Sequence, residues 1–384
     1  MALPAGAVPT TPKDDAVILE RLPFRAGDTA ARELGVLRKA VVDAPLDQMA
    51  AVALAQKYFD LAMARGDPRY VGYANAIVVR FTAPISPALL LVRGTLRQYR
   101  HDFDSALADY AAALAQDPDL AGAHAWRGAI FLVQADYASA SRECEALQSL
   151  GRTVLQGGCT GLTLAYAGQF TKAEQALQRA LAASRDDDHR LWLLTRLAEV
   201  AAWQGQLSAA ERHYRQALAI GTDDGYLLAA WSDFLLDQGR AAEVVKQLAA
   251  WEASDGLLLR LTEAEKQLKL PAAVAHQQAL ADRFAAAKLR GDTTHRAEEA
   301  RFHLRVLQDA PGAVALAAAN YQVQREPRDA RILLEAAVAA KDPVAARPAV
   351  AWMQSSGFED ARMRQLARQL FPDGRVPTNA EVPR

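Results

Sequence analysis

Residues 90–118 read LLVRGTLRQYRHDFDSALADYAAALAQDP, and this stretch decides the fold. Small, apolar and aromatic residues stand in it at offsets 0, 4, 16, 20, 23 and 28, namely Leu90, Gly94, Ala106, Tyr110, Ala113 and Pro118. Pro118 ends the second half of the stretch, because proline lacks the amide hydrogen that a helix interior needs. The pattern predicts two short antiparallel helices that cross most closely at Gly94.

The same spacing returns along the chain. Gly128 and Ala140 follow Gly94 and Ala106 by 34 residues, and later units repeat the pattern. Helices of about a dozen residues are unstable alone in water, so neighbouring units must stack to bury one continuous core. The small residues that we expect at the close helix crossings are Gly94, Ala106, Gly128, Ala140, Gly161, Ala173 and Ala210.

These units resemble the tetratricopeptide repeat (TPR) family, most specifically between residues 87 and 255. The resemblance implies an all-α fold, a right-handed α-α superhelix or TPR solenoid of about eight to nine helix pairs with capping helices at both ends. Degenerate pairs extend the solenoid over residues 28–370. We expect residues 1–27 to be a flexible leader and residues 371–384 a disordered tail.

The composition favours helices and excludes several classes of partner. Hydrophobic residues make up 51% of the 384 residues, aromatic residues only 7%, and alanine about a fifth, which favours helix over a large sheet. No apolar run reaches 18 residues, so no membrane insertion is expected. The 44 Lys and Arg residues balance 45 Asp and Glu residues, so no net field attracts nucleic acid.

The sequence contains no pattern typical of an active site. The seven histidines lack metal-ligand spacing, and Asp186-Asp187-Asp188 lacks the spacing of a calcium loop. Neither a phosphate-binding glycine loop nor a nucleophile motif is present. We therefore expect no catalytic residue, no metal and no cofactor, and a protein that is not an enzyme.

The two cysteines, Cys144 and Cys159, are predicted to lie on neighbouring helices of consecutive units. Helices packed in this way bring two Cα atoms within bridging distance. In an oxidising compartment we expect a disulfide. In the chain-entropy model, closing this loop would stabilise the folded protein by about 3 kcal/mol. The alternative is two buried thiols that pack as small apolar side chains.

Over its whole length the chain also resembles exported TPR proteins of Gram-negative bacteria. This resemblance rests on the cysteine pair and on residues 14–23, 66–74, 101–104, 320–321 and 325–329. It implies an exported, periplasmic scaffold. The first residues show no signal-peptide pattern, and a cytoplasmic location is the alternative.

The concave surface is where the TPR resemblance places binding residues. The family's helix register, carried over to this chain, selects Gln98, Tyr99, Tyr166, Trp192, Glu199, Trp203, Tyr226, Asp233 and Asp237. Aromatic rings with a few carboxylates suit an extended peptide that carries apolar and basic side chains. The alternative is that half of these aromatic residues simply pack inside the superhelix.

Two functions remain after these exclusions. The first is a non-enzymatic TPR scaffold that binds a protein or peptide partner in its concave groove. The alternative is an accessory subunit of a transport or enzyme complex that docks through its edges or caps.

Overall fold

The computed structural model describes residue 14 and residues 29–372. Within these residues the chain forms twenty α-helices and one π-helical turn, and no strand. The predicted all-α fold class is therefore confirmed. The expected leader and tail lie outside the described residues, apart from residues 14, 371 and 372.

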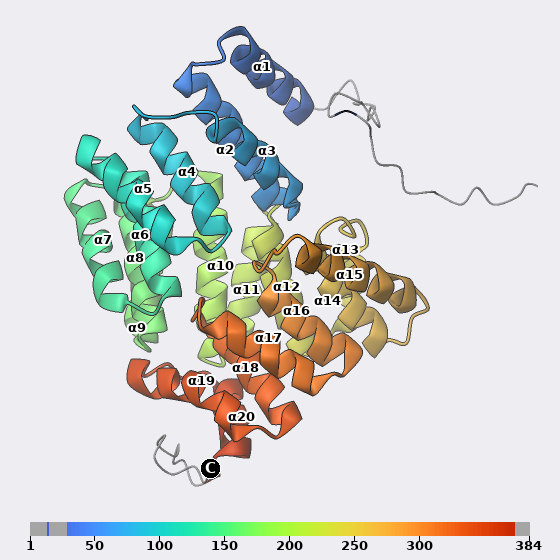
Figure 1. Cartoon of the computed structure of the whole chain (residues 1–384). Helices are drawn as coiled ribbons and strands as arrows, with labels where there is room; N and C mark the ends of the chain where they lie inside the picture. Colours follow the sequence, from blue (N-terminus) through green and yellow to red (C-terminus); the bar gives the residue numbers. More distant parts are fainter. Residues whose placement is uncertain (1–13, 15–28, 373–384) are drawn as a thin grey trace, which may run out of the picture.

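Three helices precede the regular repeats in Figure 1: α1 (Thr29–Asp43), α2 (Gln48–Arg65) and α3 (Arg69–Val78). Helix α2 begins after Asp47, whose carboxylate accepts a hydrogen bond from the Met49 amide at 2.8 Å. It ends at Gly66, which adopts a left-handed conformation with φ of 61° and lies directly against Ser254. Glycine fits this position because a side chain would strain the backbone and collide with Ser254.

Five helical hairpins follow, in phase with the predicted units. Their helices are α4 (Pro87–Tyr99), α5 (Phe103–Gln116), α6 (Ala121–Val133), α7 (Tyr137–Ser149), α8 (Thr153–Tyr166), α9 (Phe170–Ala183), α10 (Asp187–Trp203), α11 (Leu207–Leu218), α12 (Gly225–Asp237) and α13 (Ala241–Leu248). Each pair packs its two helices together and stacks on the next pair, and clusters of buried apolar residues follow one another along the stack.

The helices cross most closely at the predicted small residues. A Cβ atom on Gly94 would lie 2.5 Å from the ring of Tyr110, and one on Gly161 would lie 2.6 Å from Cγ of Leu177. Gly128 has slightly more room, with its nearest neighbour at 3.4 Å. The four alanines of the second helices have no exposed surface: Ala106, Ala140, Ala173 and Ala210.

The C-terminal part continues as less regular hairpins. Its elements are α14 (Asp255–Gln267), α15 (Ala272–Leu289), α16 (Arg296–Arg301), a π-helical turn (Phe302–Leu307), α17 (Ala310–Tyr321), α18 (Pro327–Ala340), α19 (Pro343–Ser356) and α20 (Ala361–Leu370). In Figure 1 these helices curve back, so that α17–α20 lie next to the ends of the earlier repeats.

Contacts between distant segments close the superhelix on itself. The Arg325 amide donates to the Val133 carbonyl at 2.7 Å, and Nε1 of Trp352 donates to the Tyr137 hydroxyl at 2.6 Å. Helix α12 also packs against the end of α2. The chain's own C-terminal segment therefore covers the turns of several earlier hairpins.

Replacing Gly94 with alanine tests the close crossing. The added methyl group must push the Tyr110 ring aside, so Gly94→Ala should destabilise the protein by about 1–3 kcal/mol. Thermal unfolding followed by circular dichroism should show a lower Tm.

Gly35→Ala is the matched control, because Gly35 lies in α1 with nothing within 4 Å of an added Cβ. Alanine inside a helix should raise stability there by about 0.5–1 kcal/mol. A Tm of Gly94→Ala equal to or above that of the wild type would contradict the predicted crossing.

Candidate functional site

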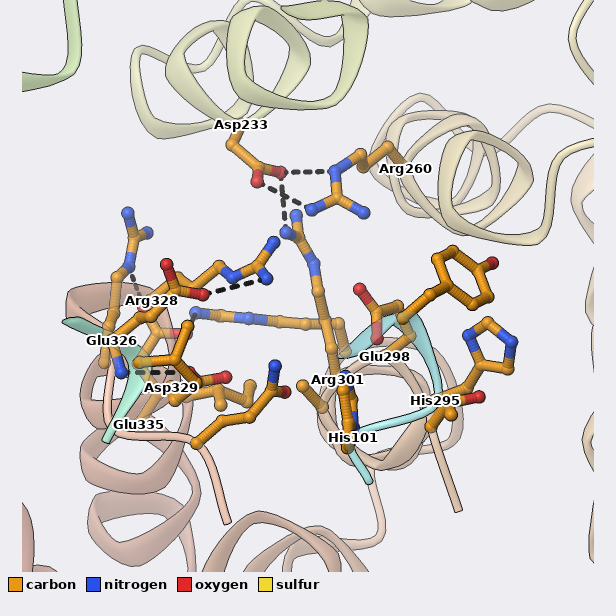
Figure 2. Close-up of a pocket in the computed structure, with 18 of the residues that line it drawn as sticks. His101, Asp233, Arg260, His295, Glu298, Arg301, Glu326, Arg328, Asp329 and Glu335 are labelled. Atoms are coloured by element: carbon orange, nitrogen blue, oxygen red, sulfur yellow. Dashed lines mark hydrogen bonds and ion pairs between the residues drawn. The ribbon is translucent and has the colours of Figure 1, made fainter. Parts of the chain in front are cut away.

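A cavity of about 510 Å³ lies inside the closed superhelix. Its walls come from α2, α4, α5, α6, α12, α14, α16, the π-helical turn, α18 and α20, so helices far apart in the sequence meet around it. Figure 2 shows how charged side chains from these helices converge. Six arginines and seven carboxylates line the cavity, which has the size of a ligand-binding pocket.

The first ion-pair cluster centres on Asp233 of α12. Arg260 donates to its two carboxylate oxygens at 2.9 and 2.8 Å, and Arg301 donates to it at 2.6 Å. Arg301 also pairs with Glu263. Burial alone would raise the pKa of Asp233, but the two guanidinium groups hold it well below its usual value. The Asp233 carboxylate is therefore ionised and already bound by the chain's own arginines.

In the second cluster three arginines share two carboxylates. Arg331 donates to both oxygens of Asp237 at 2.7 and 2.6 Å. Arg362 bridges Asp237 and Glu335, and Arg305 contacts Glu335 at 2.6 Å. Burial would raise the pKa of Glu335, but the three arginines lower it to about 2. This cluster therefore carries one positive charge in excess.

The third cluster lies at the start of α18. Glu326 pairs with Arg328 at 3.0 Å and accepts a hydrogen bond from the Tyr166 hydroxyl at 3.1 Å. Asp329 accepts from the Glu326 amide at 3.1 Å and from Nδ2 of Asn320 at 2.9 Å. Burial raises the pKa of Asp329 to about 7, against the opposing charge of Arg328. Asp329 thus changes its charge near neutral pH.

The structure brings four of the nine expected groove residues to the cavity: Gln98, Tyr99, Asp233 and Asp237. Gln98 already accepts a hydrogen bond from the Tyr110 hydroxyl at 3.1 Å. The two aspartates are held by arginines, so they are not free to bind basic side chains of a peptide.

Tyr166 and Trp203 do not face an open groove. Tyr166 is only 4% exposed, and its ring packs against Trp203 with centroids 6.0 Å apart. Trp203 in turn packs against Phe358, at 5.3 Å. The expectation that Tyr166 and Trp203 lie in an open groove is corrected here, because the C-terminal segment packs over the turns at which these two residues stand.

The remaining three expected groove residues contact neighbouring helices. Arg196 donates to the Tyr226 hydroxyl at 2.5 Å and to Glu199 at 2.8 Å, and the Tyr226 hydroxyl donates to Glu199 at 2.6 Å. The ring of Trp192 lies directly over Gly158, where it fills the space that a side chain would need. Trp192, Glu199 and Tyr226 therefore hold neighbouring repeat units together.

Sequence reasoning missed the arginines that line the cavity. They all come from residues 255–370, where the repeat is degenerate and gives no helix register. The charged segment Arg325-Glu326-Pro327-Arg328-Asp329 is the signal that points to this region.

Cys144 on α7 and Cys159 on α8 form a disulfide, with their Cα atoms 5.5 Å apart. The bond links the second helix of one unit to the first helix of the next. Among the described residues, no group of three or more His, Cys, Asp or Glu side chains is arranged to hold a metal ion. None of the helices placed by the structure has the length and apolar character needed to cross a membrane.

Comparisons with known proteins support the fold. A family model described as tetratricopeptide repeat matches residues 159–223. The chain is similar to the APC/C hetero-tetramer Cut9–Hcn1, with a TM-score of 0.53 and 13% identity over 89% of this chain and 67% of that chain. Together these two findings confirm the predicted TPR-type superhelical fold.

Weaker likeness extends to two other solved structures. Yeast Tom70 has a TM-score of 0.46 and 10% identity over 90% of this chain and 84% of that chain. A tetratricopeptide repeat protein from Parabacteroides merdae ATCC 43184 has a TM-score of 0.37 and 13% identity over 79% and 99% of the two chains. A search of the curated proteins finds no match.

The raised pKa of Asp329 predicts a specific pH dependence of stability. Its pKa of about 7 in the folded protein exceeds its ordinary value of 3.8, so the folded state holds the proton more tightly. The resulting stabilisation is complete at low pH and is lost as pH rises through 7. The free energy of unfolding is measured by urea denaturation at pH 5 and at pH 8. From pH 5 to pH 8 it should fall further for the wild type than for Asp329→Asn.

Asp282→Asn is the control for this comparison, because Asp282 is exposed on α15. Its change in stability between pH 5 and pH 8 should match that of the wild type. If Asp329→Asn also matches the wild type, the protonated carboxyl group at position 329 is ruled out.

Proposed function

We propose that the chain is a non-enzymatic scaffold that binds a protein or peptide partner through the central cavity. The observation that carries this proposal is the cavity itself, a charged hollow where the regular repeats and the C-terminal helices converge. TPR-type solenoids use their concave surfaces to bind other proteins. Cut9, whose fold is similar, forms a hetero-tetramer with Hcn1.

The size of the cavity limits what the partner inserts. About 510 Å³ holds one or a few side chains. An extended peptide along the inner face would have to displace Phe358 from Trp203. We therefore expect a partner that presents a short segment or a single side chain to the cavity.

Asp233 and Glu335, two ion-paired carboxylates of the cavity, are unsuited to acid–base chemistry. A general acid or base works best when its pKa lies near the working pH. The arginines hold the pKa values of Asp233 and Glu335 far below this range, even though burial opposes the shift. These carboxylates are suited to fix the shape and charge of the site.

The second candidate function is an accessory subunit that docks through its N-terminal cap. Four apolar side chains near α1 are more than 60% exposed: Val36, Val42, Leu46 and Met49. Exposed apolar side chains mark an interaction surface where they form one contiguous patch. This observation favours docking of a partner at the cap.

One pair of variants separates the two functions. Ala297 lines the cavity, so Ala297→Trp fills part of it, whereas Val36→Glu with Val42→Glu changes only the cap. The partner is cross-linked to the protein in native cells and recovered with it. The amount of partner recovered with Ala297→Trp should be about tenfold or more lower than with the wild type, because well-packed contacts at the centre of an interface contribute most of the binding energy. The cap variant should recover partner as the wild type does.

Ala285→Trp, on the exposed side of α15, controls for the added ring. All variants must keep the helicity of the wild type. If Ala297→Trp recovers as much partner as the wild type and the cap variant recovers less, the cavity function is overturned and docking at the cap is supported.

We also propose that the chain works in an oxidising compartment such as the periplasm, with the cytoplasm as the alternative. The disulfide between Cys144 and Cys159 supports this, because such bonds persist where the surroundings are oxidising. Protein from its native source should show no free thiol after denaturation without reductant. Reduction should lower the free energy of unfolding by about 3 kcal/mol. Two free thiols in the native material would exclude the disulfide.

A further inference from the structure

One carboxylate of the cavity stands apart from the ion pairs. In the part of the chain that the structure describes, the Glu298 side chain forms no hydrogen bond or ion pair with another residue. Figure 2 shows it in the same cavity as Asp233 and Glu326, which are both bonded to arginines. Burial would raise the pKa of Glu298, but Arg328, His295 and Arg260 lower it. Glu298 is therefore an ionised and unpaired carboxylate.

The two arginines that lower the pKa of Glu298 already pair with other carboxylates. Arg260 and Arg301 are balanced by Asp233 and Glu263. In the same way Arg328 is balanced by Glu326.

Two further neighbours of Glu298 are uncharged. Burial raises the pKa of Tyr99 to about 12 and lowers the pKa of His101 to about 4, so both are neutral at pH 7. In each case Glu298 is the charged group with the largest effect on the pKa. Within the described ranges, Glu298 is therefore a carboxylate that no cation contacts directly, and Arg328, His295 and Arg260 act on it only through space.

Aromatic rings form the adjoining wall of the cavity. Phe59 packs edge-to-face against Tyr99 and against Trp126, with ring centroids 6.3 Å apart in both pairs. All three residues line the cavity. The faces of aromatic rings attract cations and also pack against methylene groups.

We propose that this corner of the cavity binds a lysine or arginine side chain of the protein partner, with Glu298 as its counter-ion. The aromatic wall surrounds the methylene stem of that side chain, and the ammonium or guanidinium group completes an ion pair with the carboxylate. This inference rests on the proposed function and specifies the chemistry of the partner.

Calorimetry with blocked pentapeptides tests the site on the full-length protein. The probes are acetyl-Ala-Ala-X-Ala-Ala-amide with X as Lys, Arg or Gln, and free n-butylamine. The Lys and Arg peptides should bind the wild type at least about tenfold more tightly than the Gln peptide, a difference of about 1.4 kcal/mol. Butylamine should bind more weakly than the Lys peptide. Equal binding of butylamine would assign the site to a small amine and overturn its role in peptide recognition.

Variants on the same helix provide the second measurement. Glu298→Gln keeps the shape of the side chain and should weaken binding of the Lys peptide by at least about tenfold. Glu298→Asp keeps the charge and should retain most of the binding. The matched control is Glu299→Gln, because Glu299 is the next residue of α16 and does not line the cavity. It should bind as the wild type does, and all variants should show the wild-type Tm.

Three results would overturn the inference. The first is no binding of either cationic peptide to the wild type, and the second is undiminished binding to Glu298→Gln. The third is a difference between two variants in the recovery of the native partner: Ala297→Trp recovers none, whereas Glu298→Gln recovers as much as the wild type. That last result would leave the proposed cavity function standing and remove only the cation site.

Discussion

The packing of the C-terminal segment against the turns of the earlier repeats is the constraint on which the rest of the structure depends. Phe358 packs its ring 5.3 Å from that of Trp203, and the Arg325 amide bonds to the Val133 carbonyl at 2.7 Å. Repeats in a solenoid ordinarily contact only their neighbours. Here contacts across more than a hundred residues bring the C-terminal helices over the concave face and leave a partly open cavity between them.

Closure also explains why the cavity is lined with ion pairs. A charge withdrawn from water is stable only when a partner compensates for the lost hydration. Asp233 and Glu335 each bind at least two arginines from other helices, so the charges that face inward hold the surrounding helices in place. The arginine side chains of these pairs are 11–40% exposed, so removing one partner costs less than the about 3–5 kcal/mol of a fully buried pair. The network therefore fixes the shape of the cavity as well as its charge.

The sequence predicts interactions that lie within one repeat or between adjacent repeats. Gly94 and Tyr110 meet because a regular spacing places them in one hairpin. The family register also indicates which face of α4 and α12 turns inward, which is why Gln98 and Asp233 line the cavity. Tyr166 meets Glu326 from a degenerate unit 160 residues away, and no period in the sequence relates the two. The arginines of the cavity escape prediction for the same physical reason.

The dependence of the cavity on closure couples ligand binding to the fold. Its walls include α2 and α4 from one end of the chain and α18 and α20 from the other. A cation held at Glu298 therefore binds only while these ends are together. Ligand that binds only the closed form stabilises that form by about 2.7 kcal/mol when its concentration is one hundred times Kd. Occupancy of the cavity should thus strengthen the same contacts, such as Trp203 with Phe358, that create it.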